Sequence, residues 1–408
     1  MEIPRTSLIR DPYRHLLSSR RTYAGFTSED QELLKLLPEK AEILDPMSGY
    51  GLLTAFCAKR GCPSFCLEMN PPQFLWQVLC HPRDANRHAD CVSMIRQERR
   101  RWPSPRIKVA VSNDWFPAES VRLLLELLQQ CTDVAGSVLR TQRDRETFGL
   151  ALLLPFTGRF STATRGDVSA YTKKGGTCIY LGWRKDFLLY LDAVDFLLSE
   201  IRANTKCTRH ELNLGDAQNF PFPKYRFHAM VTSPPYPNHR NFASMFAPEN
   251  AFLSMIKEHG SWMTDVRLSN IIGTNAIEHR CAPQVRVTTV QAFLERVSST
   301  PRSKQAKYDD DVYYFPYFRQ YFSGLEVAYA NTATALAAPF KGFITVVNNT
   351  HRGIVIPVSE TVREIWSSLG YEARVFRATE NFHVGTKNPR ARGIRAKHTE
   401  YVIEVTRR

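Results

Sequence analysis

The chain has 408 residues, of which 43% are hydrophobic, and a formal net charge of +14. This length can bury a large core in one or two domains, and the charge favours a polyanionic partner. No apolar run reaches the ~18 residues of a membrane span, and the charged segment 1–21 lacks the apolar core of a secretory signal. Nine cysteines without paired CxxC spacing favour reduced thiols, no metal site and a cytoplasmic location.

The first motif in chain order is a short strand that ends in an acid and runs into a glycine-rich turn. Residues 41–45 read as the strand, and Asp45 closes it. Glycine suits the turn because the backbone bends sharply there and lets a ligand approach closely. A dinucleotide fingerprint would need a third glycine where Thr54 stands, and no GxxxxGK[ST] phosphate loop is present. An acid before the turn suits a cationic amino-acid group better than a pyrophosphate. The turn contains Pro46, Gly49 and Gly51.

Two further predicted strands also end in acids. Glu68 closes the strand 64–68, roughly 20 residues after the turn, which is the spacing of a ribose-hydroxyl ligand. Alone, Glu68 would be read as an ordinary surface glutamate. The strand that begins at Leu212 ends in Gly215, Asp216 and Ala217.

The stretch 232–236 follows an apolar strand at 227–231 and is the most informative part of the chain. Two adjacent prolines fix φ and have no N–H, so the chain leaves the sheet as a stiff, extended loop. Such a loop holds a carbonyl oxygen, a hydroxyl and an aromatic face in one array, which suits gripping a planar base by its exocyclic amine. The loop consists of Ser233, Pro234, Pro235 and Tyr236.

The C-terminal third reads as further α/β structure. A long helix is expected within 314–338, a strand at 342–349, a helix that Ser359 caps, and two last strands at 372–376 and 401–405. Long stretches between the motifs contain additional helices, expected at 119–131 and 183–204.

Taken in order, the motifs resemble those of S-adenosylmethionine-dependent DNA amino-methyltransferases. Asp-Pro-x-x-Gly-x-Gly from Asp45 is similar to motif I, and Ser-Pro-Pro-Tyr from Ser233 is similar to the catalytic loop, most like that of the cytosine-N4 group. The resemblance implies an α/β, Rossmann-like methyltransferase fold. Its core would be a seven-stranded, mostly parallel sheet with an antiparallel last strand, and recognition elements would be inserted into it.

The resemblance also implies roles for individual residues. Asp216 would accept a hydrogen bond from the adenine amine of S-adenosylmethionine. Ser233 and the Pro234 carbonyl would accept hydrogen bonds from the target amine while Tyr236 stacks on a flipped base. The implied catalytic residues are Ser233, Pro234, Pro235 and Tyr236. The implied cofactor-binding residues are Asp45, Pro46, Gly49, Gly51, Glu68, Asp216 and Ala217.

Several targets remain open at this stage. Serine at position 233 favours cytosine N4 over adenine N6, and an RNA guanine-N2 methyltransferase with a related loop is a further alternative. Carbon-5 methylation is disfavoured because no Pro-Cys dipeptide occurs. A DNA-binding protein with an inactive methyltransferase fold would have lost motif residues, and none is missing. The expected partners are double-stranded DNA and a cognate restriction endonuclease; the oligomeric state is open.

We divide the chain into five segments. Residues 1–70 begin the methyltransferase core, 206–236 continue it through the catalytic loop, and 312–408 complete it. Residues 71–205 and 237–311 are insertions, and either could recognise the target. Residues expected to contact nucleic acid through charge or position are Arg99, Arg100, Arg101, His239, Arg240, Lys387, Arg390 and Arg392.

Overall fold

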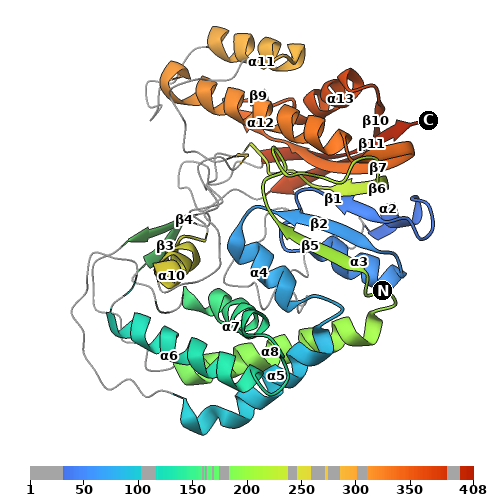
Figure 1. The fold of residues 1–408 in the computed structure, drawn as a ribbon. Coiled ribbons are helices and arrows are strands. Elements are labelled where there is room, and N and C mark those ends of the chain that lie inside the picture. The colour runs from blue at the N-terminus through green and yellow to red at the C-terminus, as the bar shows by residue number, and fades with distance from the viewer. Residues whose placement is uncertain are drawn as a thin grey trace.

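A computed structural model describes most of the chain (Figure 1). The described residues are 31–102, 116, 118–158, 160, 163–167, 170–173, 183–237, 246–258, 272–273, 285–300, 310–383 and 396–408. The strands are β1 (Ile43–Asp45), β2 (Ser64–Glu68), β3 (Ala163–Asp167), β4 (Ala170–Lys173), β5 (His210–Leu214), β6 (Phe227–Thr232), β7 (Leu336–Asn348), β8 (Thr350–His351), β9 (Ile354–Val355), β10 (Glu372–His383) and β11 (Ala396–Arg407).

Helices connect and cover these strands. They are α2 (Gln31–Lys35), α3 (Leu52–Arg60), α4 (Pro71–Leu79), α5 (Ala85–Gln97), α6 (Ala118–Ala135), α7 (Gln142–Thr157), α8 (Trp183–Asn204), α10 (Ala247–Glu258), α11 (Thr288–Ser299), α12 (Phe315–Ala333) and α13 (Val358–Ser368). A short 3₁₀ helix, η1 (Glu98–Arg101), follows α5, and a π-helical turn, η3 (Asp310–Tyr314), precedes α12.

Seven strands form the central sheet in the order β10-β11-β7-β6-β1-β2-β5. The strands from β7 to β5 pair in parallel, whereas β11 runs antiparallel to both β7 and β10. The last strand of the chain is therefore inserted between two strands of opposite direction. This arrangement confirms the predicted α/β, Rossmann-like fold with a seven-stranded, mostly parallel sheet and an antiparallel last strand.

Helices cover both faces of the sheet. Helices α2 and α3 pack on one face with Ile43, Ala229 and Val231, and α11, α12 and α13 pack on the other with Leu44, Met230 and Ile344 (Figure 1). Alternate residues of each strand thus point to opposite helical layers, as the period of two in a strand requires. The central strands β1 and β6 are apolar on both faces because both faces are buried there, whereas the edge strand β10 is largely exposed.

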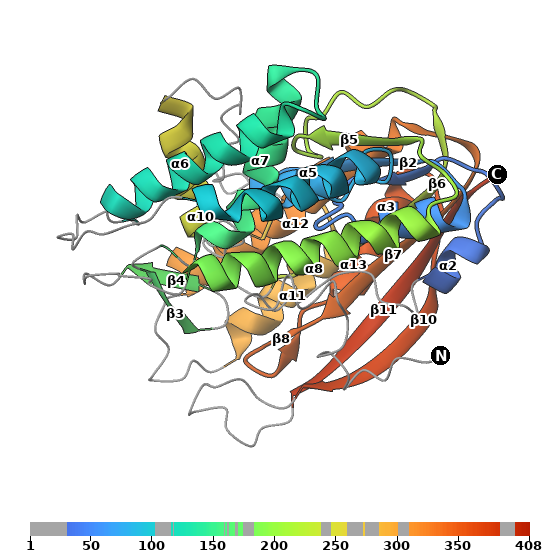
Figure 2. The same ribbon diagram turned by 90° about the horizontal axis from the view of Figure 1, so that it is seen from below.

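The insertion 71–205 forms a helical unit with its own apolar core (Figure 2). Helices α4 to α8 pack together there, and α8 has the predicted bounds, with a buried stripe that includes Phe187, Leu191 and Val194. Helix α10, from the second insertion, joins this core through Phe252 and Leu253. Helix α10 and helices α4 to α8 therefore share one apolar core.

The predicted C-terminal elements are present, with two corrections. Strands β7, β10 and β11 are all longer than expected, because β10 and β11 form a hairpin that pairs along its whole length and extends the sheet. Ser359 lies inside α13 and does not cap it; the helix begins at Val358. Asn348 performs the capping role, since its Oδ1 accepts the Ser359 N–H at 2.9 Å.

The topology places the predicted motifs on one edge. Strand β1 lies between β6 and β2, and the chain order reverses direction across β1, so the switch point of the sheet falls between β1 and β6. Ligands of open α/β sheets bind outside the carboxyl ends of the strands at such a point. Within the described segments, none of the helices combines the length and apolarity that a bilayer crossing requires.

Candidate active site

Asp45 is the deepest acid of the site. It is fully buried at the carboxyl end of β1, and its Oδ1 accepts hydrogen bonds from the Thr232 hydroxyl at 2.8 Å and the Met47 N–H at 3.2 Å. Burial raises the pKa of the Asp45 carboxyl to about 7, and these two donors oppose the rise. The bond from Thr232 joins the end of β1 to the end of β6, directly before Ser233.

The glycine turn is held from behind by Gln77 of α4. Gly49 and Gly51 have φ of 56° and 73°, in the left-handed region that favours glycine. The Gln77 amide donates to Ser48 Oγ at 2.8 Å and to the Gly49 carbonyl at 2.7 Å. A Cβ on Gly51 would lie 2.7 Å from Gln77 Cγ. The turn thus needs glycine both for its conformation and for the close approach of α4.

Glu68 is the second buried acid. It closes β2, and its Oε1 accepts the Asn70 N–H at 2.7 Å. Burial raises the pKa of Glu68 to about 8, and the negative charge of Asp45 adds to the rise, whereas the N–H groups of Asn70 and Gly49 lower it. Asp45 and Glu68, at the ends of neighbouring strands, are therefore close enough to interact electrostatically at the sheet edge, next to the glycine turn.

Asp216 follows β5 in a tight turn. Its Oδ1 accepts the Gln218 N–H at 2.9 Å, and the Gln218 side-chain amide lies 3.1 Å and 3.3 Å from its two oxygens. Partial burial raises the pKa of Asp216, and Gln218 opposes the rise. The neighbouring Ala217 is buried, and its carbonyl accepts a 3.0 Å hydrogen bond from Asn331 of α12.

The Ser-Pro-Pro-Tyr loop leaves β6 beside β7. The Ser233 hydroxyl donates to the Thr345 carbonyl at 3.1 Å and lies 3.3 Å from the Tyr236 hydroxyl. A serine has one hydroxyl hydrogen, and the Thr345 carbonyl accepts it. In the contact between the Ser233 and Tyr236 hydroxyls, Tyr236 is therefore the donor. Ser233 Oγ keeps a lone pair and is an acceptor toward any further partner.

Helix α12 fixes the second half of this loop. The Tyr321 hydroxyl donates to the Pro235 carbonyl at 2.9 Å, and Tyr321 itself is 1% exposed. Tyr236 is 7% exposed, so little of its ring faces solvent. The prolines remove two N–H donors from the loop, and Tyr321 satisfies one of the carbonyls that remain. The loop is held at both ends by side chains or strands that are themselves buried.

Comparisons with known proteins leave the family open. No protein-family model matches the chain, and no curated protein matches it. Two solved structures of the rRNA methyltransferase aviRa from Streptomyces viridochromogenes are similar to it. One has 10% identity and a TM-score of 0.30, covering 95% of this chain and 89% of that chain. The other has 11% identity and a TM-score of 0.29, covering 98% and 93%. Values this low do not indicate an activity.

The residues at the sheet edge fit a ligand rich in hydrogen-bond donors. Asp45 Oδ2 and Asn70 Oδ1 are buried acceptors with no hydrogen-bond partner among the described residues, and such atoms are costly to bury unless a partner arrives. S-adenosylmethionine carries an ammonium group, two ribose hydroxyls and an adenine amine. Acids at the ends of β1, β2 and β5 would accept those donors, and the glycine turn leaves room for close approach.

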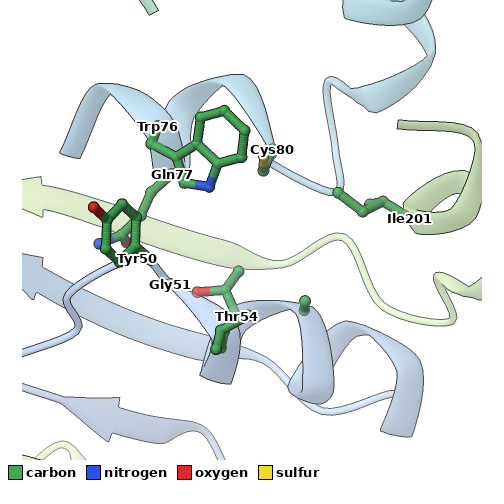
Figure 3. Close-up of a pocket in the computed structure, with 9 residues that line it drawn as sticks. Tyr50, Gly51, Thr54, Trp76, Gln77, Cys80 and Ile201 are labelled. Carbon is green, nitrogen blue, oxygen red and sulfur yellow. The ribbon is translucent and has the colours of Figure 1, made fainter. Parts of the chain in front are cut away.

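A small cavity lies behind the glycine turn, between α3, α4 and α8 (Figure 3). Trp76 and Gln77 of α4 and Cys80 directly after it line one side, and Tyr50 and Thr54 line the other. Its volume is about 20 Å³, room for about one water molecule. This cavity is too small for a nucleoside cofactor.

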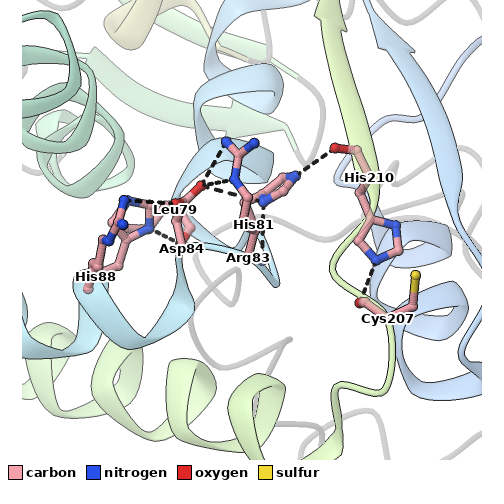
Figure 4. Close-up of polar contacts among 8 residues, drawn as sticks. Leu79, His81, Arg83, Asp84, His88, Cys207 and His210 are labelled. Atoms are coloured by element: carbon pink, nitrogen blue, oxygen red, sulfur yellow. Dashed lines mark hydrogen bonds and ion pairs between the residues drawn. The ribbon is translucent and has the colours of Figure 1, made fainter.

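Buried histidines at the junction of α4 and α5 with β5 are structural (Figure 4). The His81 ring lies 3.2 Å from the His210 carbonyl and accepts the Arg83 N–H at 3.3 Å, so one ring nitrogen donates and the other accepts. Ser64 Oγ lies 2.9 Å from His210 Nδ1. Within the described part of the chain, no group of three or more potential ligands could hold a metal ion. The seven cysteines described there are free thiols.

Only some of the residues predicted to contact nucleic acid lie within the described structure. Arg99 is exposed in η1, directly after α5. Arg96, from the same basic run, pairs with Asp192 at 2.5 Å and Asp195 at 3.3 Å on α8 and is therefore structural. The side chains of Arg100 and Arg101 lie outside the described structure. The residues that lie wholly outside it are His239, Arg240, Lys387, Arg390 and Arg392.

Four residues of the site escaped the sequence analysis. Thr232 and Gln218 stand next to predicted residues, and a signal existed for each: a hydroxyl directly before the loop, and an amide two residues after an acid, where side chains and backbone hydrogen-bond locally. Gln77 and Tyr321 gave no signal. Each lies on a helix whose position against its motif depends on the tertiary structure.

Proposed function

We propose that the chain is an S-adenosylmethionine-dependent methyltransferase that acts on the exocyclic amine of a nucleic-acid base. The first candidate target is cytosine N4 in double-stranded DNA. The observation that carries the proposal is the acceptor state of Ser233 Oγ, whose hydrogen is donated to the Thr345 carbonyl. Ser233 directly follows Thr232, whose hydroxyl bonds the buried acid Asp45.

The cofactor would be held by side chains that accept hydrogen bonds. Asp45 suits the cationic amino-acid group, Glu68 the ribose hydroxyls and Asp216 the adenine amine. When bound, S-adenosylmethionine supplies a methyl group activated on a sulfonium. The hydrogen bond between Thr232 and Asp45 sets the distance between the cofactor side and the target side, because these residues end neighbouring strands.

The target amine would be oriented by the loop. An exocyclic nitrogen is a poor nucleophile because its lone pair is delocalised into the ring. Ser233 Oγ and the Pro234 carbonyl, as acceptors, would bind its hydrogens and favour the tetrahedral geometry in which the lone pair is localised. Once methylated, the nitrogen would release one of its protons to solvent. Alignment of the reacting atoms would contribute the rest of the rate acceleration.

The base must leave the duplex to reach this loop, at a cost of a few kcal/mol. The net charge of +14 favours the polyanionic partner that such a reaction requires. A neutral serine at the first loop position favours cytosine N4 over adenine N6. The same acceptors would suit adenine N6 or guanine N2, so these targets are outcomes of the test.

Nucleoside mass spectrometry tests the proposal. The protein is incubated with isotopically methyl-labelled S-adenosylmethionine and either unmethylated plasmid DNA or total RNA, and each polymer is digested to nucleosides. We expect labelled N4-methyldeoxycytidine from the DNA and none with Ser233→Ala. Labelled N6-methyladenine or N2-methylguanine would change the target but keep the reaction. No labelled nucleoside in either polymer would overturn the proposal.

A further inference from the structure

The sheet face that packs against α2 and α3 changes from apolar to polar at its carboxyl edge. On three adjacent strands, β1, β6 and β7, this face carries the buried apolar residues Ile43, Val231 and Phe343. Side chains of a strand return to the same face every second residue. The next positions on this face are Asp45, Ser233 and Thr345. A row of three polar side chains therefore follows the row of apolar ones.

The strand register places Thr345 beside Ser233. Thr232 is paired with Ile344 across β6 and β7. Ser233 and Thr345 are the next residues along, and the Ser233 hydroxyl donates to the Thr345 carbonyl at 3.1 Å. On its other side Thr345 is paired with Val402 of β11, which belongs to the same apolar cluster. Directly opposed residues share a face, so the Thr345 side chain lies on the face toward α2 and α3.

The Thr345 hydroxyl is buried and has no hydrogen-bond partner among the described residues. Thr345 is 4% exposed, and its Oγ1 is an unpaired buried atom. Such an atom is costly to bury unless a partner arrives. Strand β7 lies on the side of β6 away from β1, so Thr345 is farther than Ser233 from the acid Asp45. A partner for this hydroxyl is therefore expected on the target base and not on the cofactor.

The chemistry of the base identifies the group that fits. An exocyclic amine has two hydrogens, and under the proposed function Ser233 Oγ and the Pro234 carbonyl accept both. The neighbouring hydroxyl can then donate its own hydrogen to an acceptor beside the amine. On their Watson–Crick edges, cytosine has such an acceptor in its ring nitrogen N3, and adenine has one in N1. Guanine has an N–H donor at this place.

We propose that Thr345 is a specificity-determining residue that donates a hydrogen bond to the ring nitrogen beside the target amine. This inference rests on the proposed function and narrows its target to cytosine or adenine. The loop supplies acceptors for the amine, and the adjacent strand supplies a donor for the ring nitrogen. A base must present both groups side by side to be aligned.

Thr345→Val tests the donation, because valine has nearly the shape of threonine and no hydroxyl. Single-turnover rates are measured on duplexes that contain the methylated site with either the natural base or its deaza analogue. The analogue, 3-deazacytosine or 1-deazaadenine, keeps the amine and replaces the ring nitrogen with a C–H group. Thr345→Val should reduce the wild-type preference for the natural base by about tenfold, the scale of one hydrogen bond. Thr345→Ser keeps the hydroxyl and should keep the preference. Comparing preferences between proteins cancels any change in amine reactivity that the analogue itself brings.

The matched control is Thr361→Val. Thr361, on α13, is also a buried threonine whose Oγ1 has no partner in the described structure. Both valine variants remove a buried unpaired hydroxyl and should melt at or above the wild-type temperature, but Thr361→Val should leave the base preference unchanged. Equal preferences in Thr345→Val and Thr345→Ser, or N2-methylguanine as the labelled product, would overturn this inference alone. No methylation of any nucleic acid by the wild-type protein would overturn the proposed function together with it.

Discussion

The Thr232 hydroxyl donates a 2.8 Å hydrogen bond to Asp45 Oδ1, across 187 positions of sequence. Both residues are fully buried, and they end two neighbouring parallel strands on either side of the switch point of the sheet. The acid proposed to bind the cofactor and the loop proposed to hold the target base are therefore parts of one hydrogen-bonded unit.

Thr232→Val should weaken S-adenosylmethionine binding by about tenfold, because a hydrogen bond to a charged group contributes roughly 1.5–3 kcal/mol. Loss of the donor also removes an interaction that lowers the pKa of Asp45, which is about 7 with the donor present. An ammonium group binds the ionised acid, so affinity should rise with pH through about 7 in the wild type and at a higher pH in the variant. Calorimetry across pH 5–9 measures both effects.

Thr332→Val is the control for that substitution. Thr332 is also fully buried, and its hydroxyl donates to the Ala328 carbonyl within α12 at 2.7 Å. Thr332→Val should leave the pH dependence of S-adenosylmethionine affinity unchanged. An identical profile for Thr232→Val and wild type would remove the Asp45 carboxylate from cofactor binding.

Ser233→Ala should lower the methyl-transfer rate by about a hundredfold, the scale on which loss of one transition-state hydrogen bond acts. Affinity for S-adenosylmethionine should stay within a factor of two or so. Single-turnover rates and calorimetry separate the two quantities. Tyr236→Phe, which keeps the ring and loses the hydroxyl that donates to Ser233, should have the smaller effect on rate. Equal losses in rate and cofactor affinity for Ser233→Ala would contradict the role given to the serine.

Gly51→Ala should abolish cofactor binding and destabilise the fold. A left-handed φ costs a non-glycine residue roughly 1–2 kcal/mol, and the new Cβ would lie 2.7 Å from Gln77 Cγ. Gly353→Ala separates the two causes, because Gly353 has a φ of +78° and nothing within 4 Å of its Cβ position. Urea unfolding should show a larger loss for Gly51→Ala, and equal losses would mean that Gln77 moves freely aside.

Lowering the pH should destabilise the junction of α4 and α5 with β5. Burial lowers the pKa of His81 to about 4 from an ordinary value of 6.5. The unfolded chain then binds more protons than the folded one between these values, so stability falls as pH falls from about 6.5 to 4, by about 3 kcal/mol for this group. His81→Gln removes this group, whereas His88 and His210, whose pKa values burial also lowers, are still present. Denaturant unfolding at pH 7.5 and 4.5 should therefore show a smaller pH effect in the variant, and an equal effect would exclude His81 as its source.

The sequence predicted the parts of the site that depend on local order. Strand ends, the glycine turn and the proline loop are each encoded within about ten residues, and the parallel topology brings their carboxyl ends to one edge. Glu68 was ambiguous on its own, and only its burial beside Asp45 distinguishes it from a surface glutamate.

Contacts between distant segments could not be predicted in the same way. The bond from Tyr321 to Pro235 spans 86 positions, and the contribution of α10 to the insertion core depends on how two excursions fold against each other. The misassigned cap at Ser359 has the same cause. A serine before an apolar run favours an N-cap, but here the Ser359 N–H is bonded by the side chain of Asn348, which comes from β7.

Calorimetric titration of the wild-type protein with S-adenosylmethionine, with and without a double-stranded oligonucleotide, tests the central claim most directly. The buried acceptors at the ends of β1, β2 and β5 predict saturable binding with one site per chain, and Asp45→Ala should abolish it. Absence of heat in every buffer between pH 6 and 9, from a protein that melts cooperatively, would contradict the account.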